Sequence, residues 1–324
     1  MEDLMNIQIV EPSVTLVDSE QNNYNSLAEA LMCKVERCGR IAYKSVNTTG
    51  LDATERFIKA IVKRGHYSVL EHVRLMIKIR INSRIAYDIF NCATYHRYIE
   101  TSKRILPFDD YVIKGNLRAF KEWIENARAY QCPQSADYIA AWYVNEELSS
   151  MFPWVFQPIE WDCPKEFKDN TMIISEDPDY HTFHVVTDRG IMAEWTRHRN
   201  DCSYTVESTR YCNYNKKGIV FCQPTPHELL PTLHDEVLWQ LSMQQCATIY
   251  NELIERGIKP EIARNVLPMS LKSEFMVTMT DEAWKHFLEL RTASDAHPQI
   301  RYLANSVHWI LNCLWGKPTE LKKD

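Results

Sequence analysis

The stretch HTFHVVTDRGIMAEWTRHRNDCSYTVESTRY, residues 181–211, determines how the rest of the chain is interpreted. Its first part, 181–187, is rich in branched and aromatic residues and predicts a β-strand. Residues 190–199 have helical spacing and end on the triplet RHR at 197–199. A turn rich in hydroxyl groups follows and contains Arg210. The stretch therefore predicts a strand, a helix and a cluster of cations beside them.

This concentration of arginine contrasts with the chain as a whole. The 324 residues carry a formal net charge of -6, which argues against broad nucleic-acid binding. Guanidinium groups match phosphate oxygens two at a time, as a fork. A local cationic cluster on an acidic protein is therefore a candidate site for an anionic ligand.

The composition is that of a soluble globular protein, with 45% hydrophobic and 25% charged residues. The length allows one large or two ordinary domains. The sequence shows no apolar run of about 18 residues and no signal sequence, so we expect a cytoplasmic protein with no membrane partner. Its 10 cysteines form no CxxC pair, so no structural metal site is expected and most are expected to be buried thiols.

The patterns along the chain predict an α+β protein with an antiparallel sheet and helices packed on it. Helical spacing occurs at 24–44, 52–64, 115–130, 135–152, 232–256, 260–266, 281–291 and 296–314. We expect Asp52 to cap the second of these helices. Strands are expected in the second half of 65–81 and at 273–280, with a helix carrying Arg84, Tyr87 and Phe90 after the first of them.

Residues 81–104 resemble residues 187–210 when the two segments are aligned. In the first segment Cys-Ala-Thr at 92–94 stands where the second has RHR. This similarity indicates a degenerate internal repeat, or an insertion, at about 78–180 within a single domain that spans 1–324. Two strand–helix units of similar periodicity could also look alike by chance.

Four blocks of sequence follow one another in the order of a known family's signatures. They are GHYSVLEH (65–72), RHR with STRY (197–199 and 208–211), ARNVLP (263–268) and FLELRTASDAHPQIR (287–301). In this order they resemble the flavin-dependent thymidylate synthases, and the resemblance implies that the first block, 65–72, lies at the edge of the sheet. Each block alone has an ordinary structural explanation, such as a surface ion pair for an arginine or a turn cap for a serine. Their joint order is what carries the resemblance.

The resemblance implies a fold, an activity and a set of ligands. The fold is the family's α+β fold, extended here by a mainly helical insertion and a helical C-terminal part. The activity is reductive methylation of dUMP to dTMP, with methylenetetrahydrofolate as the one-carbon donor and NADPH as the reductant. FAD is the implied cofactor, because no side chain can supply a hydride. A homotetramer is implied, or a dimer if the internal repeat is real.

The resemblance also implies roles for individual residues. Arg291 is the implied catalytic residue, which would polarise the pyrimidine ring. The residues implied to bind the flavin are His66, Ser68, Glu71, Glu194, Arg197, His198, Arg199, His286 and His297. The residues implied to bind the nucleotide are Ser208, Thr209, Arg210, Tyr211, Arg264 and Arg291. The resemblance implies no metal ligand.

Two departures from the family pattern keep alternatives open. Arg199 and Ser208 are separated by one residue more than in the family pattern. The loop at 208–211, which the resemblance implies to hold the nucleotide phosphate, is therefore expected to be reshaped. Thr280 and Glu282 stand where family members often carry Asn and Arg for the flavin. One alternative is an enzyme that methylates or hydroxymethylates another pyrimidine nucleotide, dCMP or UMP. Another is a non-catalytic subunit that binds flavin or nucleotide.

Overall fold

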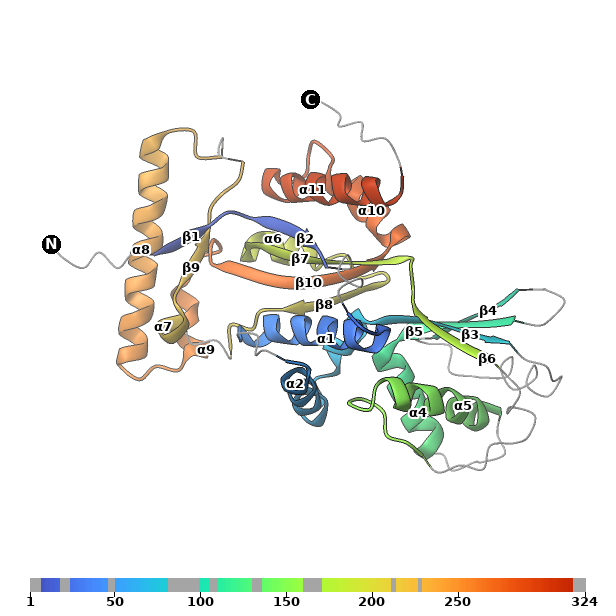
Figure 1. The fold of residues 1–324 in the computed structure, drawn as a ribbon. Helices are drawn as coiled ribbons and strands as arrows, with labels where there is room; N and C mark the ends of the chain where they lie inside the picture. Colours follow the sequence, from blue (N-terminus) through green and yellow to red (C-terminus); the bar gives the residue numbers. More distant parts are fainter. Residues whose placement is uncertain are drawn as a thin grey trace. The chain divides into compact units, whose positions relative to one another are not determined.

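The computed structural model in Figure 1 describes residues 7–17, 24–45, 50–80, 99–104, 110–129, 136–159, 171–210, 214–226 and 229–316. The chain divides into two compact units. The C-terminal unit comprises Met1–Asp18, Arg40–Val46 and His181–Asp324, and the N-terminal unit comprises Ser19–Gly39 and Asn47–Tyr180. Among the described residues, no helix is both long enough and apolar enough to cross a membrane.

A four-stranded sheet in the order β2–β7–β10–β8 forms the centre of the C-terminal unit. The strands are β2 Ser13–Leu16, β7 Tyr180–Asp188, β10 Lys272–Thr280 and β8 Cys202–Val206. Both edge strands pair antiparallel with their neighbours, with Ser13 opposite Val186 and Val206 opposite Phe275. The central strand β10 is buried along almost its whole length, because core side chains and helices cover it.

Three helices pack on this sheet and supply most of the core. They are α6 Arg189–Trp195, α10 Asp281–Arg291 and α11 Pro298–Leu314, and Figure 1 shows α10 and α11 side by side over the strands. Trp195 and Phe287 stack with ring centroids 4.6 Å apart, and Trp284 meets Phe287 edge-on at 5.6 Å. These aromatic contacts fix α10 against the end of α6, where the RHR triplet begins.

The remaining elements of the C-terminal unit form a smaller core. A parallel pair, β1 Gln8–Val10 with β9 Val220–Cys222, lies beside the long helix α8 Leu233–Glu255, as Figure 1 shows. The short elements are α7 Tyr214–Lys217, α9 Pro260–Ala263 and η5 Arg264–Val266. Helix α8 starts with a capping box between Thr232 and Asp235, which fixes its first turn.

The N-terminal unit contains a second four-stranded sheet in the order β4–β5–β3–β6. Its strands are β4 Ile99–Arg104, β5 Asp110–Asn116, β3 Arg74–Arg80 and β6 Thr171–Glu176, all paired antiparallel. Its helices are α2 Leu51–Lys63, η2 Tyr67–His72, α4 Leu117–Ala129 and α5 Ala136–Met151, and α1 Leu27–Tyr43 spans the division after Gly39. Along β3 the apolar residues Leu75, Ile77 and Ile79 are fully buried and alternate with half-buried neighbours. This alternation is the one predicted from the sequence.

The two sheets have the same internal order. In each, three successive strands of the sheet (β3, β4 and β5, or β7, β8 and β10) are arranged with the first beside the third, which in turn lies beside the second. A fourth strand, β6 or β2, completes the opposite edge. In each unit the third strand leads directly into a helix, α4 or α10, and a further helix follows.

The α+β class and the antiparallel pairing are confirmed, and four details differ from the prediction. The described residues hold two four-stranded sheets, whereas one sheet was expected. The second sheet was missed because its short strands β4, β5 and β6 have no clear sequence pattern and their pairing is set by tertiary contacts. Residues 65–72, expected at the edge of a sheet, form η2 and the turn before it. Gly50, not Asp52, is the N-cap of α2. Helix α6 ends at Trp195, before the RHR triplet. The expected helix with Arg84, Tyr87 and Phe90 lies outside the described residues.

Candidate functional site

The RHR triplet lies in a turn between α6 and β8. The phenol of Tyr204 on β8 shares its single O–H between the carbonyls of Trp195 at 3.1 Å and His198 at 2.9 Å. These bonds satisfy carbonyl oxygens that a continuing helix would have used, so α6 ends there. Asp201 has a left-handed backbone with φ of 46°, which turns the chain back into β8. Burial raises the pKa of Tyr204, so its phenol stays protonated and remains a donor.

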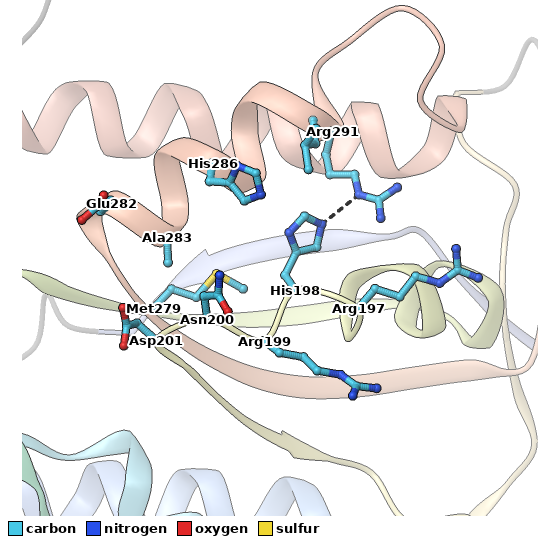
Figure 2. A pocket seen from close by; sticks show the side chains of 11 residues that line it. Arg197, His198, Arg199, Asn200, Asp201, Met279, Glu282, Ala283, His286 and Arg291 are labelled. Atoms are coloured by element: carbon cyan, nitrogen blue, oxygen red, sulfur yellow. Dashed lines mark hydrogen bonds between the residues drawn. The ribbon is translucent and has the colours of Figure 1, made fainter. Parts of the chain in front are cut away.

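A pocket of about 600 Å³ opens beside this turn, between it and helix α10. It is lined by Arg197, His198, Arg199, Asn200, Asp201, Met279, Glu282, Ala283, His286, Leu290 and Arg291. Figure 2 shows His198 of the turn pointing toward Arg291 of α10. His286, also on α10, lies nearby. Three arginines face two carboxylates in this lining, so the pocket favours an anionic or strongly hydrogen-bonding ligand.

The guanidinium of Arg291 donates three hydrogen bonds to His198 and Glu194. Its Nε donates to His198 Nε2 at 3.0 Å, its Nη1 to Glu194 Oε2 at 3.1 Å, and its Nη2 to the Glu194 carbonyl at 3.2 Å. A guanidinium has five N–H donors, so two remain. Within the described part of the chain, no protein atom accepts from those two. Arg291 is therefore fixed in orientation while it still presents donors to a ligand.

His198 is a neutral acceptor in this arrangement. Burial, the charge of Arg291 and His286 together lower the pKa of His198 to about 4. The ring is therefore uncharged near neutral pH, and Nε2 can accept from Arg291. The proton of the neutral ring then lies on Nδ1. The ring of His198 also contacts Phe287 edge-on, with centroids 4.9 Å apart, which fixes the plane of the imidazole.

The predicted nucleotide residues lie on a second part of the C-terminal unit. Ser208, Thr209 and Arg210 form the loop after β8, and Arg264 Nη1 donates to the hydroxyl of Thr209. The Arg210 backbone N–H donates to Ser208 Oγ at 3.4 Å. The structure thus brings Arg264 to this loop from 55 residues further along the chain. Tyr211, predicted with them, lies outside the described residues.

The remaining predicted flavin residues do not line this pocket. His66 and Ser68 are exposed in the N-terminal unit, where His66 is the N-cap of η2. Glu71 makes an ion pair with Arg118 Nη1 at 2.6 Å in the same unit. His297 is the N-cap of α11, and its Nδ1 accepts from the Gln299 backbone N–H at 3.2 Å.

Several residues of the site were not singled out from the sequence. The pocket is also lined by Asn200, Asp201, Met279, Ala283 and Leu290. Asn200 and Asp201 follow the RHR triplet directly, which is a signal that could have found them. The other three lie on β10 and α10, and their part in the pocket depends on how these elements pack.

The donor set of the pocket fits a flavin. A flavin offers ring carbonyl oxygens and a pyrophosphate, and Arg197, Arg199, His198 and His286 carry side chains that bind such groups. Glu282 adds a carboxylate that would repel the pyrophosphate, so that group fits best near Arg197 and Arg199. Among the described residues, no group of three or more His, Cys, Asp or Glu side chains could hold a metal ion.

Comparison with known proteins gives the same family as the sequence blocks. Residues 178–312 match the family model Thy1, described as thymidylate synthase complementing protein. The flavin-dependent thymidylate synthase of Pyrococcus abyssi is 33% identical over 108 residues, which are 33% of this chain and 44% of that protein. The enzyme of Thermococcus onnurineus is 34% identical over 110 residues, again 44% of its length. The chain thus matches less than half the length of these relatives.

A more extended match covers most of the chain. The flavin-dependent thymidylate synthase of Aquifex aeolicus is 22% identical over 314 residues, with 85% of this chain and 92% of that protein covered. Among solved structures, a UMP/dUMP methylase PolB from Streptomyces cacaoi bound with 5-Br dUMP is similar over 60% of this chain, with 22% identity and a TM-score of 0.36. The family model over residues 178–312 and the similarity to the curated proteins confirm the resemblance of this chain to the flavin-dependent thymidylate synthases.

Proposed function

We propose that this chain is a flavin-dependent thymidylate synthase with the family's fold, which uses FAD and transfers a one-carbon unit from methylenetetrahydrofolate to carbon 5 of dUMP. NADPH is the proposed reductant. The observation that carries the proposal is the guanidinium of Arg291, which is held by Glu194 and His198 at the wall of a cationic pocket. This pocket lies within the segment that matches the family model.

Arg291 can perform the central task of the reaction. Carbon 5 of a uracil ring becomes nucleophilic only if negative charge can build up on the ring carbonyls. The two remaining N–H donors of Arg291 are available to stabilise that charge, and their orientation is set before the ligand arrives. A single preorganised donor of this kind typically changes the rate by about 100- to 1000-fold.

The flavin, when bound, supplies the hydride that no side chain can provide. Arg197, Arg199, His198 and His286 would hold it in the pocket. His198 stays neutral there and offers Nδ1–H as a donor. His66, Ser68, Glu71, Glu194 and His297 remain proposed flavin residues on the basis of the resemblance.

The loop Ser208–Arg210 with Arg264 would bind the phosphate of the nucleotide, together with Tyr211. A serine hydroxyl, backbone N–H groups and two guanidiniums are the donors that a phosphate dianion prefers. Arg264 already donates to Thr209, so the loop and the second arginine are connected before the ligand binds. The proposed enzyme is cytoplasmic and a homo-oligomer, either a tetramer or a dimer.

The test is a reconstituted reaction. Purified protein would be supplied with FAD, NADPH, methylenetetrahydrofolate and dUMP, and dTMP would be measured by mass spectrometry. Parallel reactions would replace dUMP with dCMP or UMP, and products would be examined for methyl and hydroxymethyl groups. We expect dTMP only in the complete dUMP reaction.

The other outcomes separate the alternatives. Turnover of dCMP or UMP in place of dUMP would identify a related enzyme with a changed substrate. Bound FAD without turnover of any of the three nucleotides would indicate a non-catalytic subunit. A protein that binds no FAD at tens of micromolar would contradict the proposal altogether.

A further inference from the structure

A buried group of charges lies directly beneath the phosphate loop. Glu207 is the first residue after β8, and its backbone N–H donates to the Glu274 carbonyl on β10 at 2.8 Å. Its side chain is only 1% exposed, although it is a carboxylate. Ser208, the first of the proposed phosphate residues, follows it immediately. Whatever holds Glu207 therefore also fixes where the loop begins.

Two lysines and a phenol surround this carboxylate. Lys272 Nζ lies 3.1 Å from Glu207 Oε2, Tyr214 donates its hydroxyl to Oε1 at 3.1 Å, and Lys44 Nζ lies 3.8 Å from Oε1. Lys272 also pairs with Glu274 at 2.7 Å. Two positive charges thus balance two negative ones, which a buried group requires because an unpaired buried charge is strongly unfavourable.

Lys44 reaches this group from another part of the chain. It has a left-handed backbone with φ of 46°, uncommon for a residue with a side chain. Its ammonium also lies 5.1 Å from the centre of the Tyr214 ring, in a cation–π contact. A strained backbone persists only where surrounding contacts hold it, and here those contacts converge on Glu207.

Two further bonds hold the same loop. The Ser208 backbone N–H donates to the Ala42 carbonyl at 3.2 Å, close to Lys44 in the chain. Thr209, which is buried, accepts from Arg264. Each of the residues Glu207, Ser208 and Thr209 is therefore tied to a different segment, whereas Arg210 is exposed.

We propose that Glu207 is a positioning residue for the nucleotide phosphate, and that Lys44 and Lys272 hold it in place. The inference rests on the proposed function, since it assigns the loop to a phosphate monoester dianion. Buried ion pairs add little net stability but can impose one geometry. The consequence is that Glu207 affects affinity for the phosphate and leaves the chemistry at the pyrimidine ring unchanged.

The test is Glu207→Gln, which keeps the volume and the acceptor for Tyr214 but removes the charge. Binding of dUMP and of deoxyuridine, which lacks the phosphate, would be measured by calorimetry on the FAD-loaded protein. We expect dUMP affinity to fall by about tenfold or more and deoxyuridine affinity to stay within about twofold. In turnover assays KM for dUMP should rise while kcat changes little.

The matched control is Glu176→Gln in the N-terminal unit. Glu176 pairs with Lys34 at 2.7 Å, with side chains 14% and 8% exposed, so this change also removes one charge of a buried ion pair. It should lower the melting temperature without changing dUMP affinity. If Glu207→Gln fails to fold, Lys44→Met takes its place, since the Lys44 side chain is 20% exposed and tolerates change better. We expect the same pattern with a smaller loss, about threefold.

Three results would overturn the inference. If the folded variant binds dUMP as tightly as the unmodified protein, Glu207 has no positioning role, although the proposed function stands. If the variant's affinity for dUMP and its affinity for deoxyuridine fall equally, the substitution disturbs the whole site and not specifically the contacts with the phosphate. If the unmodified protein binds no pyrimidine nucleotide, the proposed function itself is wrong and this inference fails with it.

Discussion

Arg291 illustrates how much of one residue's behaviour is decided by its neighbours. On a helix surface an arginine with a nearby glutamate is usually a solvent-exposed ion pair that contributes little. Here three of its five donors are fixed by His198 and Glu194. The rotamer freedom that such a long side chain would lose on binding a ligand has already been lost on folding. Its role in the proposed reaction follows from this preorganisation.

The first prediction concerns Arg291 itself. Arg291→Ala should reduce kcat by about 100-fold or more, because charge on the pyrimidine ring loses its donors. FAD affinity should stay within about threefold, because Arg197 and Arg199 remain. Steady-state kinetics and FAD titration by fluorescence would measure the two effects. Equal losses in both would show that Arg291 serves the flavin instead.

The second prediction concerns the partner of that arginine. Glu194→Gln keeps an oxygen acceptor and the backbone carbonyl bond but removes the negative charge beside Nη1. We expect a smaller fall in kcat than in Arg291→Ala, about tenfold, because the guanidinium is held less firmly. KM for dUMP should change less than kcat. A variant with unchanged kcat would indicate that the negative charge of Glu194 is not needed to orient the guanidinium.

The third prediction follows from the low pKa of His198. Its pKa is about 4 in the folded protein and 6.5 in the unfolded chain, so the unfolded chain binds the proton more readily between these values. The neutral ring therefore contributes fully to stability above about pH 6.5, and the contribution is lost as pH falls toward about 4. Urea unfolding at about pH 7 and about pH 5 should show a larger loss for the unmodified protein than for His198→Gln. Equal losses in the two proteins would mean that His198 is not the group responsible.

Some of these residues could be predicted from sequence and others could not. Arg291, the RHR triplet and Arg264 were found because they stand in ordered blocks with distinctive neighbours. The bond between Glu194 and Arg291 joins residues 97 apart, and no local pattern encodes it. The same holds for Lys272 and Lys44, whose burial near Glu207 depends on how three segments pack. Sequence reasoning therefore found candidate groups but not the contacts that orient them.

Among the elements, α6 links the sheet to the pocket. Its N-cap is Asp188, whose carboxylate accepts from the Ile191 backbone N–H at 2.8 Å and also from the buried amide of Gln299. Asp188 is half-buried, and this burial raises the pKa of its carboxyl group. The cap thus ties the start of α6 to α11, and the other end of α6 leads into the RHR turn.

The fourth prediction concerns that cap. Asp188→Ala should lower the free energy of unfolding by about 1–2 kcal/mol, since the first turn of α6 loses an acceptor. It should also weaken FAD binding, because the helix that leads into Arg197 is less firmly placed. The control is Thr232→Ala, which removes the cap of α8 at a comparable cost. Equal FAD affinity in the two variants would show that the cap of α6 does not affect FAD binding in the pocket.

At this scale the sequence predicted helices better than strands. The range 281–291 matches α10 at both ends, because Thr280 is a good N-cap and the apolar spacing is regular. The RHR triplet was placed on a helix because its spacing continues that of α6, but bonds from Tyr204 end the helix earlier. Strand β6 exposes Ile173, so its pattern did not alternate as a half-buried strand would.

At the scale of the whole molecule, the shared strand order of the two sheets favours the internal repeat, which stays a prediction. The correspondence extends to the helices that follow. Asn116 at the end of β5 accepts from the Ala119 backbone N–H, as Thr280 at the end of β10 accepts from that of Ala283. Counted from these caps, Phe120 and Trp284 occupy the same position and are both fully buried. Similar buried positions and caps are what a duplicated strand–helix unit would retain.

The functional side chains do not correspond in the same way. Counted from the same caps, Ala127 occupies the position of Arg291, and Glu122 that of His286. Glu122 is instead engaged with Arg118, at 2.7 Å. The N-terminal unit therefore has no guanidinium at the point where the C-terminal unit holds the proposed catalytic one. If the two units arose by duplication, only one retains the chemistry at the pyrimidine.

The last prediction is that each chain has one pyrimidine site. Equilibrium dialysis of dUMP against FAD-loaded protein should reach a plateau at one nucleotide per chain, because Ala127 cannot donate to a ring carbonyl. Arg291→Ala should then remove nearly all dUMP turnover, whereas a second active unit would leave about half of it. Ala127→Ser serves as the control, since it alters the corresponding helix position without adding charge and should leave turnover unchanged. A plateau at two nucleotides per chain, or half the turnover remaining in Arg291→Ala, would mean that the N-terminal unit carries a site of its own.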